Sequence, residues 1–255
     1  MKKSLIIALV LAMCLCGCGK ETDDSSDQST TGAGGTVVIT DCETPSEPAE
    51  KDAQPKRATV YDSHGNVFYH ISYEYDADGK ILKMINTDAN GEEMSHAERE
   101  YNADGNEVKV LLYSKDKLVS SEETKYDGKV KIEKIAYDAD GNVDSVVKYE
   151  CDSDGNAVKE TKYTHAGELD CVFEVKYNAD GKETEMIQLS ADGSTVMRSV
   201  YEYNGDGNMT KLTQYYGDGS LFGYFDYEYD ANGNMTKMTE YDENGKSDRI
   251  IVYEY

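Results

Sequence analysis

Hydrophobic and polar residues alternate along short segments from about residue 57 to the end of the chain. In the longer segments tyrosine occupies alternate positions, as in Tyr73 and Tyr75 or Tyr227 and Tyr229, with an acidic residue such as Glu74 between them. A period of two is typical of a β-strand with one apolar and one polar face. No window of about 11 residues shows a helical stripe. The pattern therefore predicts an all-β domain.

Glycine separates these segments at a regular interval. From Gly141 onward, spacings of 14 and 12 residues alternate, which gives a repeat of 26 residues. The rhythm is also present from Gly65 to Gly105. It blurs before Gly141, where Lys117 occupies one expected glycine position and Gly128 lies in a shortened turn. A fixed period of this length indicates a repeat architecture.

Most turns place Asp or Asn ahead of the glycine, as in Tyr137-Asp138-Ala139-Asp140-Gly141. The carboxylate or amide side chain can bond nearby backbone N–H groups, and glycine accepts the positive φ that a tight hairpin requires. We therefore expect short hairpin loops with a left-handed glycine and a bulge.

Fifteen such turn sites predict about sixteen strands. Laid flat at about 4.8 Å per strand, the sheet would be roughly 75 Å wide. Open twisted sheets rarely exceed about 10 strands without curling or splitting. The sequence therefore predicts a long antiparallel meander, curled or coiled, built from 26-residue double-strand repeats, with its tyrosine face turned inward.

The predicted hairpin loop also gives a strand register. A three-residue loop pairs Tyr75 with Ile81 and, if the ladder is regular, Tyr73 with Lys83. The same offset predicts the pairs Tyr201–Lys211 and Tyr227–Lys237. Lysine stems that lie against aromatic rings would favour this register over a one-residue slip.

The tyrosine face allows two interpretations. If it is exposed on a concave surface, it could bind a sugar or an extended peptide, and otherwise it packs as an aromatic core. The candidate ligand-facing residues are Tyr73, Tyr201, Tyr227 and Tyr253.

Residues 1–18 have a different character. Lys2 and Lys3 precede an apolar run that is too short for a permanent transmembrane helix and ends in Leu15-Cys16-Gly17-Cys18. This segment resembles the signal peptide and lipobox of bacterial lipoproteins. The resemblance implies diacylation of Cys18, and two acyl chains anchor a protein stably. We expect lipid anchoring at the extracytoplasmic face of the cell membrane; an ordinary secretory signal is the alternative.

Residues 19–56 contain all three prolines together with many Ser, Thr, Gly, Asp and Glu residues. Such a composition cannot bury enough apolar surface to fold alone, so we expect a disordered tether before a repeat domain at 57–255. The whole chain has 50 acidic against 26 basic residues, a formal charge of -24. This charge repels nucleic acid, which is therefore not an expected partner.

The reactive residue types form no recognisable catalytic motif. Cys42 lies in the tether, and one strand is expected between Cys151 and Cys171, which places them about 10 Å apart and unpaired. The chain has four histidines: His64, His70, His96 and His165. Of these, His70 and His96 occupy equivalent positions one repeat apart on the acidic face, which is a weak metal signal. We predict no enzyme, no resident metal and no cofactor.

The recurring pattern in Tyr227-Glu228-Tyr229-Asp230-Ala231-Asn232-Gly233-Asn234 resembles the YD repeat of RHS-type bacterial surface and toxin proteins. The similarity covers about residues 57–255 and implies strands that wind into a curled sheet or shell. The period here is longer than the usual YD unit, and the chain ends within a repeat at Tyr253-Glu254-Tyr255. We expect a sheet too small to enclose a passenger protein, so only the architecture is carried over.

Together these features predict a membrane-anchored, extracytoplasmic β-repeat lipoprotein with a binding or envelope-structural role. Its partners would be the membrane, through the lipid anchor, and a cell-wall glycan or surface protein. One alternative is a calcium-stabilised surface module, because carboxylates in tight loops suit a hard cation. Another is an accessory or immunity partner of a secreted toxin.

Overall fold

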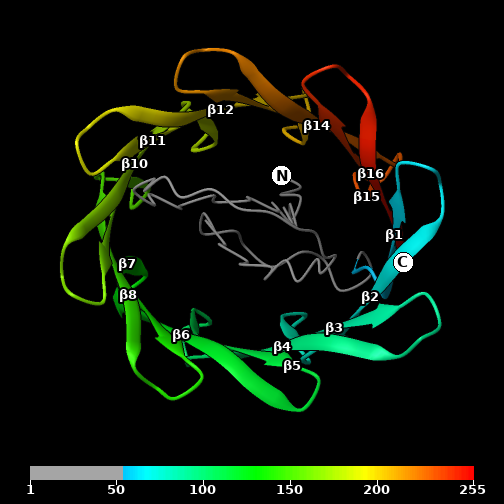
Figure 1. Cartoon of the computed structure of the whole chain (residues 1–255), viewed down its shortest axis with the longest axis horizontal. Coiled ribbons are helices and arrows are strands. Elements are labelled where there is room, and N and C mark those ends of the chain that lie inside the picture. The colour runs from blue at the N-terminus through cyan, green and yellow to red at the C-terminus, as the bar shows by residue number, and fades with distance from the viewer. Residues whose placement is uncertain (1–53) are drawn as a thin grey trace, which may run out of the picture. The chain divides into compact units, whose positions relative to one another are not determined.

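The computed structural model describes residues 54–255, which form an all-β barrel (Figure 1). The predicted signal peptide, Cys18, Cys42 and most of the predicted tether lie outside the described residues. Within the described range no helix is long and apolar enough to cross a membrane.

Sixteen strands follow one another along the chain. They are β1 (Arg57–Asp62), β2 (Val67–Tyr75), β3 (Ile81–Asp88), β4 (Glu93–Tyr101), β5 (Glu107–Ser114), β6 (Lys117–Asp127), β7 (Val130–Asp138), β8 (Val143–Cys151), β9 (Ala157–Thr164), β10 (Leu169–Tyr177), β11 (Glu183–Ser190), β12 (Thr195–Tyr203), β13 (Met209–Tyr216), β14 (Leu221–Tyr229), β15 (Met235–Asp242) and β16 (Ser247–Glu254). The prediction of an all-β domain with about sixteen antiparallel strands is confirmed.

The sheet closes on itself, which the sequence pattern did not predict. β1 pairs antiparallel with β16, from Arg57 opposite Glu254 to Asp62 opposite Arg249. The ladder starts before β1, because the Lys56 N–H donates to the Glu254 carbonyl at 2.7 Å. Closure leaves no unpaired strand edge. With strands tilted by the usual 35–45°, sixteen of them give a backbone diameter of roughly 30 Å.

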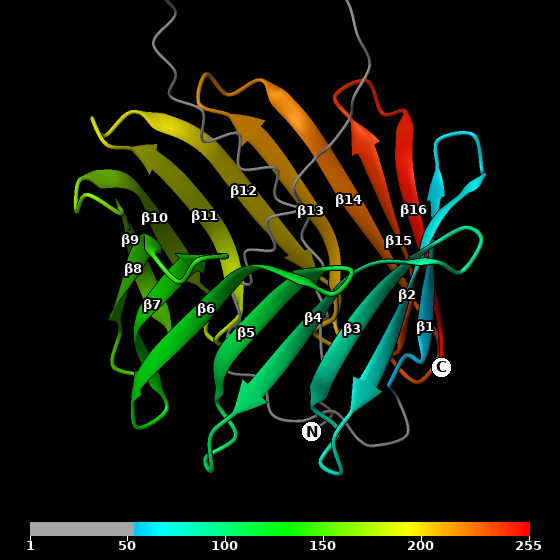
Figure 2. The ribbon, with the colours of Figure 1, turned by 60° about the horizontal axis from the view of Figure 1, so that its bottom comes forward.

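The hairpins define two ends of the barrel (Figure 2). Turns that lead from an even strand to an odd strand lie at the same end as the first and last described residues. Gln54 there donates from Nε2 to the Gly79 carbonyl at 2.7 Å, and Tyr255 donates to the Met235 carbonyl at 2.8 Å. We call this end the terminal mouth. Turns from an odd to an even strand form the opposite end, the distal mouth.

Each of the hairpins contains a register shift of one residue. After Tyr75 pairs with Ile81 as predicted, Leu82 is extra, so Lys83 lies opposite Glu74 and Met84 lies opposite Tyr73. The predicted Tyr73–Lys83 pair is therefore wrong. Equivalent bulges make the other two predicted pairs wrong as well. Tyr201 lies opposite Leu212, and Tyr227 lies opposite Met238. Bulges increase local twist and bend a strand, which favours closure of the sheet.

The turn chemistry follows the sequence closely. Gly141 has φ of 82°, and the carboxylate of Asp138 accepts the backbone N–H groups of Asp140 and Asn142 at 2.9 and 2.8 Å. The turn between β5 and β6 lacks glycine, and there Lys115 adopts the left-handed conformation with φ of 52°. Lys117, which stands at the expected glycine position, is the first residue of β6.

Side chains alternate between an inner and an outer face of the barrel wall. The large apolar residues that are nearly inaccessible, such as Ile71, Leu212 and Phe225, share one face by the strand pairing. Because the outside of a barrel wall is open to solvent, this face is the inner one. Large apolar side chains that are fully buried include Val60 on β1 and Ile251 on β16, which flank the closing seam, as well as Ile71 on β2 and Leu212 on β13.

Candidate functional site: the barrel interior and its mouths

The four tyrosines singled out from the sequence all lie on the inner face. Tyr73, Tyr227 and Tyr253 are only 8%, 6% and 7% exposed, whereas Tyr201 is half-buried. Burial raises the pKa of the Tyr73, Tyr227 and Tyr253 phenols well above the usual value near 10. Little ring surface of these three residues is therefore open to a ligand, and their side chains act in the packing of the wall.

At the terminal mouth, the hydroxyls of a second set of tyrosines link neighbouring strands through hydrogen bonds to main-chain carbonyls. The hydroxyl of Tyr101 on β4 donates to the Ile81 carbonyl on β3 at 2.8 Å, and Tyr229 on β14 donates to the Met209 carbonyl on β13 at 2.8 Å. The same bond recurs at Tyr75, Tyr126, Tyr177 and Tyr255. The sequence contains a signal for these bonds, a tyrosine directly before each of these turns, but the alternating pattern alone does not show which group the hydroxyl meets.

Paired charges that the sequence pattern does not reveal lie on the inner wall. Lys134 on β7 reaches Glu122 on β6 at 3.2 Å between Nζ and Oε2, and Arg249 on β16 lies 3.7 Å from Glu240 on β15. Arg99 forms a further ion pair with Glu107 at 2.5 Å. Burial raises the pKa of the Glu240 carboxyl, and the nearby Arg249 opposes this shift. The interior therefore combines aromatic packing with paired charged groups.

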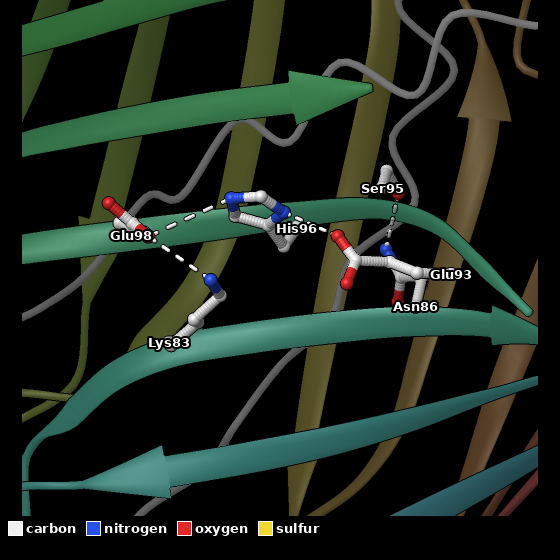
Figure 3. A network of polar contacts seen from close by, with 6 residues as sticks. All are labelled: Lys83, Asn86, Glu93, Ser95, His96 and Glu98. Carbon is white, nitrogen blue, oxygen red and sulfur yellow. Dashed lines mark hydrogen bonds and ion pairs between the residues drawn. The ribbon is translucent and has the colours of Figure 1, made fainter. Parts of the chain in front are cut away.

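On the outer face, β3 and β4 carry a polar network (Figure 3). His96 lies between two carboxylates, with Nδ1 2.6 Å from Glu93 and Nε2 3.7 Å from Glu98, and its ring stacks on Tyr113 at 4.5 Å. Lys83 completes the network through a 3.1 Å ion pair with Glu98. Asn86 and Ser95 bond across the same two strands at 3.0 Å, but on the inner face, because Asn86 lies opposite Ile71.

The candidate metal ligands do not converge. His70 on β2 is bonded to Thr59 at 3.0 Å, and β3 separates it from His96 on β4. Burial lowers the pKa of His70. His64 and His165 lie in two different turns, between β1 and β2 and between β9 and β10. Among the described residues no group of three or more His, Cys, Asp or Glu side chains is placed to hold a metal ion.

Turn carboxylates are already used in closing their hairpins. Asp230, for example, accepts the N–H groups of Asn232 and Asn234 through Oδ1 at 2.8 and 2.9 Å. These hydrogen bonds lower the pKa of the Asp230 carboxyl below its usual value. Hairpin closure thus accounts for the acidic residues that motivated the calcium alternative.

Cys151 and Cys171 are not joined in a disulfide bond. They lie on β8 and β10, with β9 between them. Cys151 is half-buried and occupies the position that tyrosine holds in most other repeats, where its Sγ donates to the Lys131 carbonyl at 3.7 Å. Burial raises the pKa of the Cys151 thiol, which disfavours the nucleophilic thiolate.

The extra residue of each bulge at the distal mouth forms a ring, which we call the distal ring. Its members are Phe68, Met94, Val119, Asp144, Asp170, Val196, Phe222 and Asp248. Phe68 contacts Tyr69, Phe222 contacts Tyr216, and Asp170 pairs with Lys162 at 3.2 Å. These three partners belong to the inner face by the strand pairing, so their ring neighbours lie at the opening of the barrel.

The corresponding ring at the terminal mouth has a different chemistry. Its members are Leu82, Val108, Ile132, Val158, Thr184, Thr210 and Thr236. The threonine hydroxyls are engaged with their own hairpins: Thr236, for example, donates to the Glu228 carbonyl at 3.2 Å. The two mouths therefore differ: the distal ring combines aspartates with apolar residues, and the terminal ring combines threonines with apolar residues.

No known family model matches the chain, and no curated protein sequence matches it. Among solved structures, it is similar to the Photorhabdus luminescens Tc holotoxin pore at 15% identity, with a TM-score of 0.34 over 71% of this chain and 9% of that one. A porin-like protein from Bacteroides vulgatus has 13% identity and a TM-score of 0.48, over 79% of this chain and 98% of that one. A porin-like protein from Bacteroides uniformis has 14% identity and a TM-score of 0.37, over 79% and 96%. Similarities at this level assign neither a function nor a ligand.

Proposed function

We propose that this chain is a lipid-anchored β-barrel on the extracytoplasmic face of a cell membrane, where it acts as a binding module and not as an enzyme. The single observation that carries this proposal is the chemistry of the outer face. Cross-strand ion pairs such as Lys109–Glu123 at 3.2 Å and Lys237–Glu228 at 2.9 Å lie on it. Charged side chains on the outside of a barrel suit water and oppose contact with hydrocarbon. In this proposal the protein is attached to the membrane through lipid on Cys18 and not through its strands.

The repeat supports the same proposal at the level of architecture. Tyrosine hydroxyl bonds, left-handed glycines and bulges recur from hairpin to hairpin around the barrel. This recurrence favours a YD-like repeat body, in which every unit serves the wall and none carries a unique reactive group. A wall of this kind suits recognition by its mouths and interior.

The anchor can be tested by metabolic labelling with a palmitate analogue, followed by separation of membranes from soluble protein. The Cys18→Ala variant is expected to lose the label and to leave the membrane fraction. Cys16→Ala is the matched control and should keep both. A Cys18→Ala barrel that stays in the membrane without lipid would show that the strands themselves are embedded, and would refute the proposal.

A further inference from the structure

We propose that the distal mouth is a docking site for a cationic, amphipathic polypeptide segment of another protein. This inference rests on the proposed function, because it supplies the binding module with a site and a class of partner. The ring that forms the site was defined by the strand register, which is independent of the lipobox.

The first support is exposed apolar surface. Phe68, the most exposed large apolar residue that the structure describes, is 59% exposed, and Met94, Val119 and Val196 are 39–40% exposed. Tyr216, which contacts Phe222 of the ring, is 48% exposed. Of the exposed large apolar residues in the described chain, the three at the terminal mouth are Leu82, Ile132 and Tyr255. Apolar surface concentrated at one rim and bordered by polar turns is typical of a protein-binding site.

The second support is charge. Three of the eight ring members are aspartates, and no ring member is basic. The hairpins that border the ring add negative charge through carboxylates that also close their own turns, among them Asp62, Asp88, Asp138 and Asp242. Acidic groups beside exposed aromatic and aliphatic side chains complement a segment that carries lysine or arginine on one face and apolar residues on the other.

The same charges argue against the other candidate occupants. Residues 19–53 of this chain hold nine acidic and two basic residues, so the tether repels the ring. A second copy would present the same aspartates to the first. Anionic lipid headgroups are disfavoured for the same reason. Only a cationic partner gains from both the apolar and the acidic members of the ring.

The test uses the full chain with Cys18→Ala, so that lipid plays no part in binding. Three synthetic probes of equal length are compared by fluorescence anisotropy: a Lys/Leu amphipathic peptide, a Glu/Leu amphipathic peptide and a Lys/Ser peptide. An N-acetylglucosamine oligomer is the sugar probe. We expect binding of the Lys/Leu peptide, weakened by salt, and at least tenfold weaker binding of the other three.

Two ring variants locate the site. Phe68→Ser with Val196→Ser should lower affinity for the Lys/Leu peptide at least tenfold, and Asp144→Asn with Asp248→Asn should reduce its salt dependence. The matched control is Leu82→Ser with Ile132→Ser, which changes apolar residues of similar exposure, 41% and 44%, at the terminal mouth. This control should leave affinity unchanged.

Three outcomes would overturn the inference: equal losses in both pairs of serine variants, equal binding of the Glu/Leu peptide, or concentration-dependent self-association that is abolished by the distal ring variants. Binding of the sugar probe alone would refute a polypeptide partner, but it would not contradict the proposed function as an anchored binding module. Failure of palmitate labelling, by contrast, would refute the anchor without affecting this assay. The circular dichroism spectrum and unfolding midpoint of each variant show whether the barrel is still folded.

Discussion

The hydroxyl of Tyr229 bonds to a main-chain carbonyl on the neighbouring strand, where the turn between β14 and β15 begins. Such a bond contributes when the carbonyl would otherwise lose a partner on folding, and neutral hydrogen bonds of this type are worth about 1 kcal/mol. Tyr229 is half-buried, so solvent replaces the bond only in part. The tyrosines at the terminal mouth thus stabilise hairpins as well as covering apolar surface.

We therefore expect Tyr229→Phe to lower the free energy of unfolding by about 1 kcal/mol, because the ring remains and only the hydroxyl is lost. Urea denaturation measures the change. Tyr216→Phe is the control, since its side chain is 48% exposed and lies at the other mouth. Equal effects of the two substitutions would contradict a specific role for the Tyr229 hydroxyl.

Tyrosine burial also predicts a response to alkaline pH. The folded-state pKa is raised, chiefly by burial, for Tyr69, Tyr73, Tyr75, Tyr203, Tyr227, Tyr229, Tyr253 and Tyr255; for Tyr255 it reaches about 12. Above the unfolded pKa near 10, the unfolded chain loses phenolic protons that the folded chain keeps. The free energy of unfolding should therefore be unaffected by these groups below pH 10 and should fall as pH rises through 10 to 12.

The measurement combines tyrosinate absorbance with circular dichroism across that pH range. Most of the shifted tyrosines should ionise together with loss of the strand signal. If all of the tyrosines ionised near pH 10 while the strand signal persisted, the inner face would be solvated and the assignment of its burial would be wrong.

At the scale of the hairpin, one left-handed residue per turn lets the chain reverse within a few residues. Gly141 illustrates the constraint, because no atom lies within 4 Å of a Cβ built there, so its φ of 82° alone disfavours a side chain. Gly205 lies in the turn before β13 without a left-handed φ and with the same open surroundings. Comparison of these two glycines therefore isolates backbone strain, because a Cβ would meet no other atom at either position.

Gly141→Ala is expected to lower the free energy of unfolding by about 1–2 kcal/mol through backbone strain. Gly205→Ala, by the same measurement, should leave stability unchanged or raise it slightly, because alanine restricts the unfolded chain. Gly141→Asn should recover part of the loss, since asparagine tolerates the left-handed region. A loss at Gly205 as large as that at Gly141 would contradict this account.

At the scale of the whole molecule, the β1–β16 seam decides between a closed barrel and an open coiled sheet. Arg57 and Glu254 are exposed and lie directly opposite each other in this seam. Directly paired residues in antiparallel strands have Cα separations within the range that a disulfide spans. An open sheet would hold these two residues far apart.

Arg57→Cys with Glu254→Cys should therefore form a 57–254 disulfide on mild oxidation, which mass spectrometry of proteolytic fragments identifies among the native cysteines. Arg57→Cys with Lys176→Cys is the control, since Lys176 lies on β10, remote from β1 in the strand order. That pair should not be linked within one chain. Absence of the 57–254 bridge in a folded protein would exclude closure.

Several features of the barrel could be predicted from residues that act locally. Alternating tyrosines indicated strands, and Asp-x-Asp-Gly turns indicated hairpins, because side-chain direction and turn conformation depend on immediate neighbours. The predicted Tyr73–Lys83 register failed for a related reason. Leu82 is inserted as a bulge residue, and an alternating pattern does not show on which side of a turn the extra residue falls.

The sequence by itself determined the strand class and the number of hairpins, since each depends on short-range pattern. Tertiary structure decided the rest. Closure between β1 and β16 joins segments that are almost a full domain length apart, and it depends on twist accumulated over all the hairpins. Only that closure places Phe68, Asp170 and Val196 around one opening, because residues on successive even strands become a ring when the first strand meets the last.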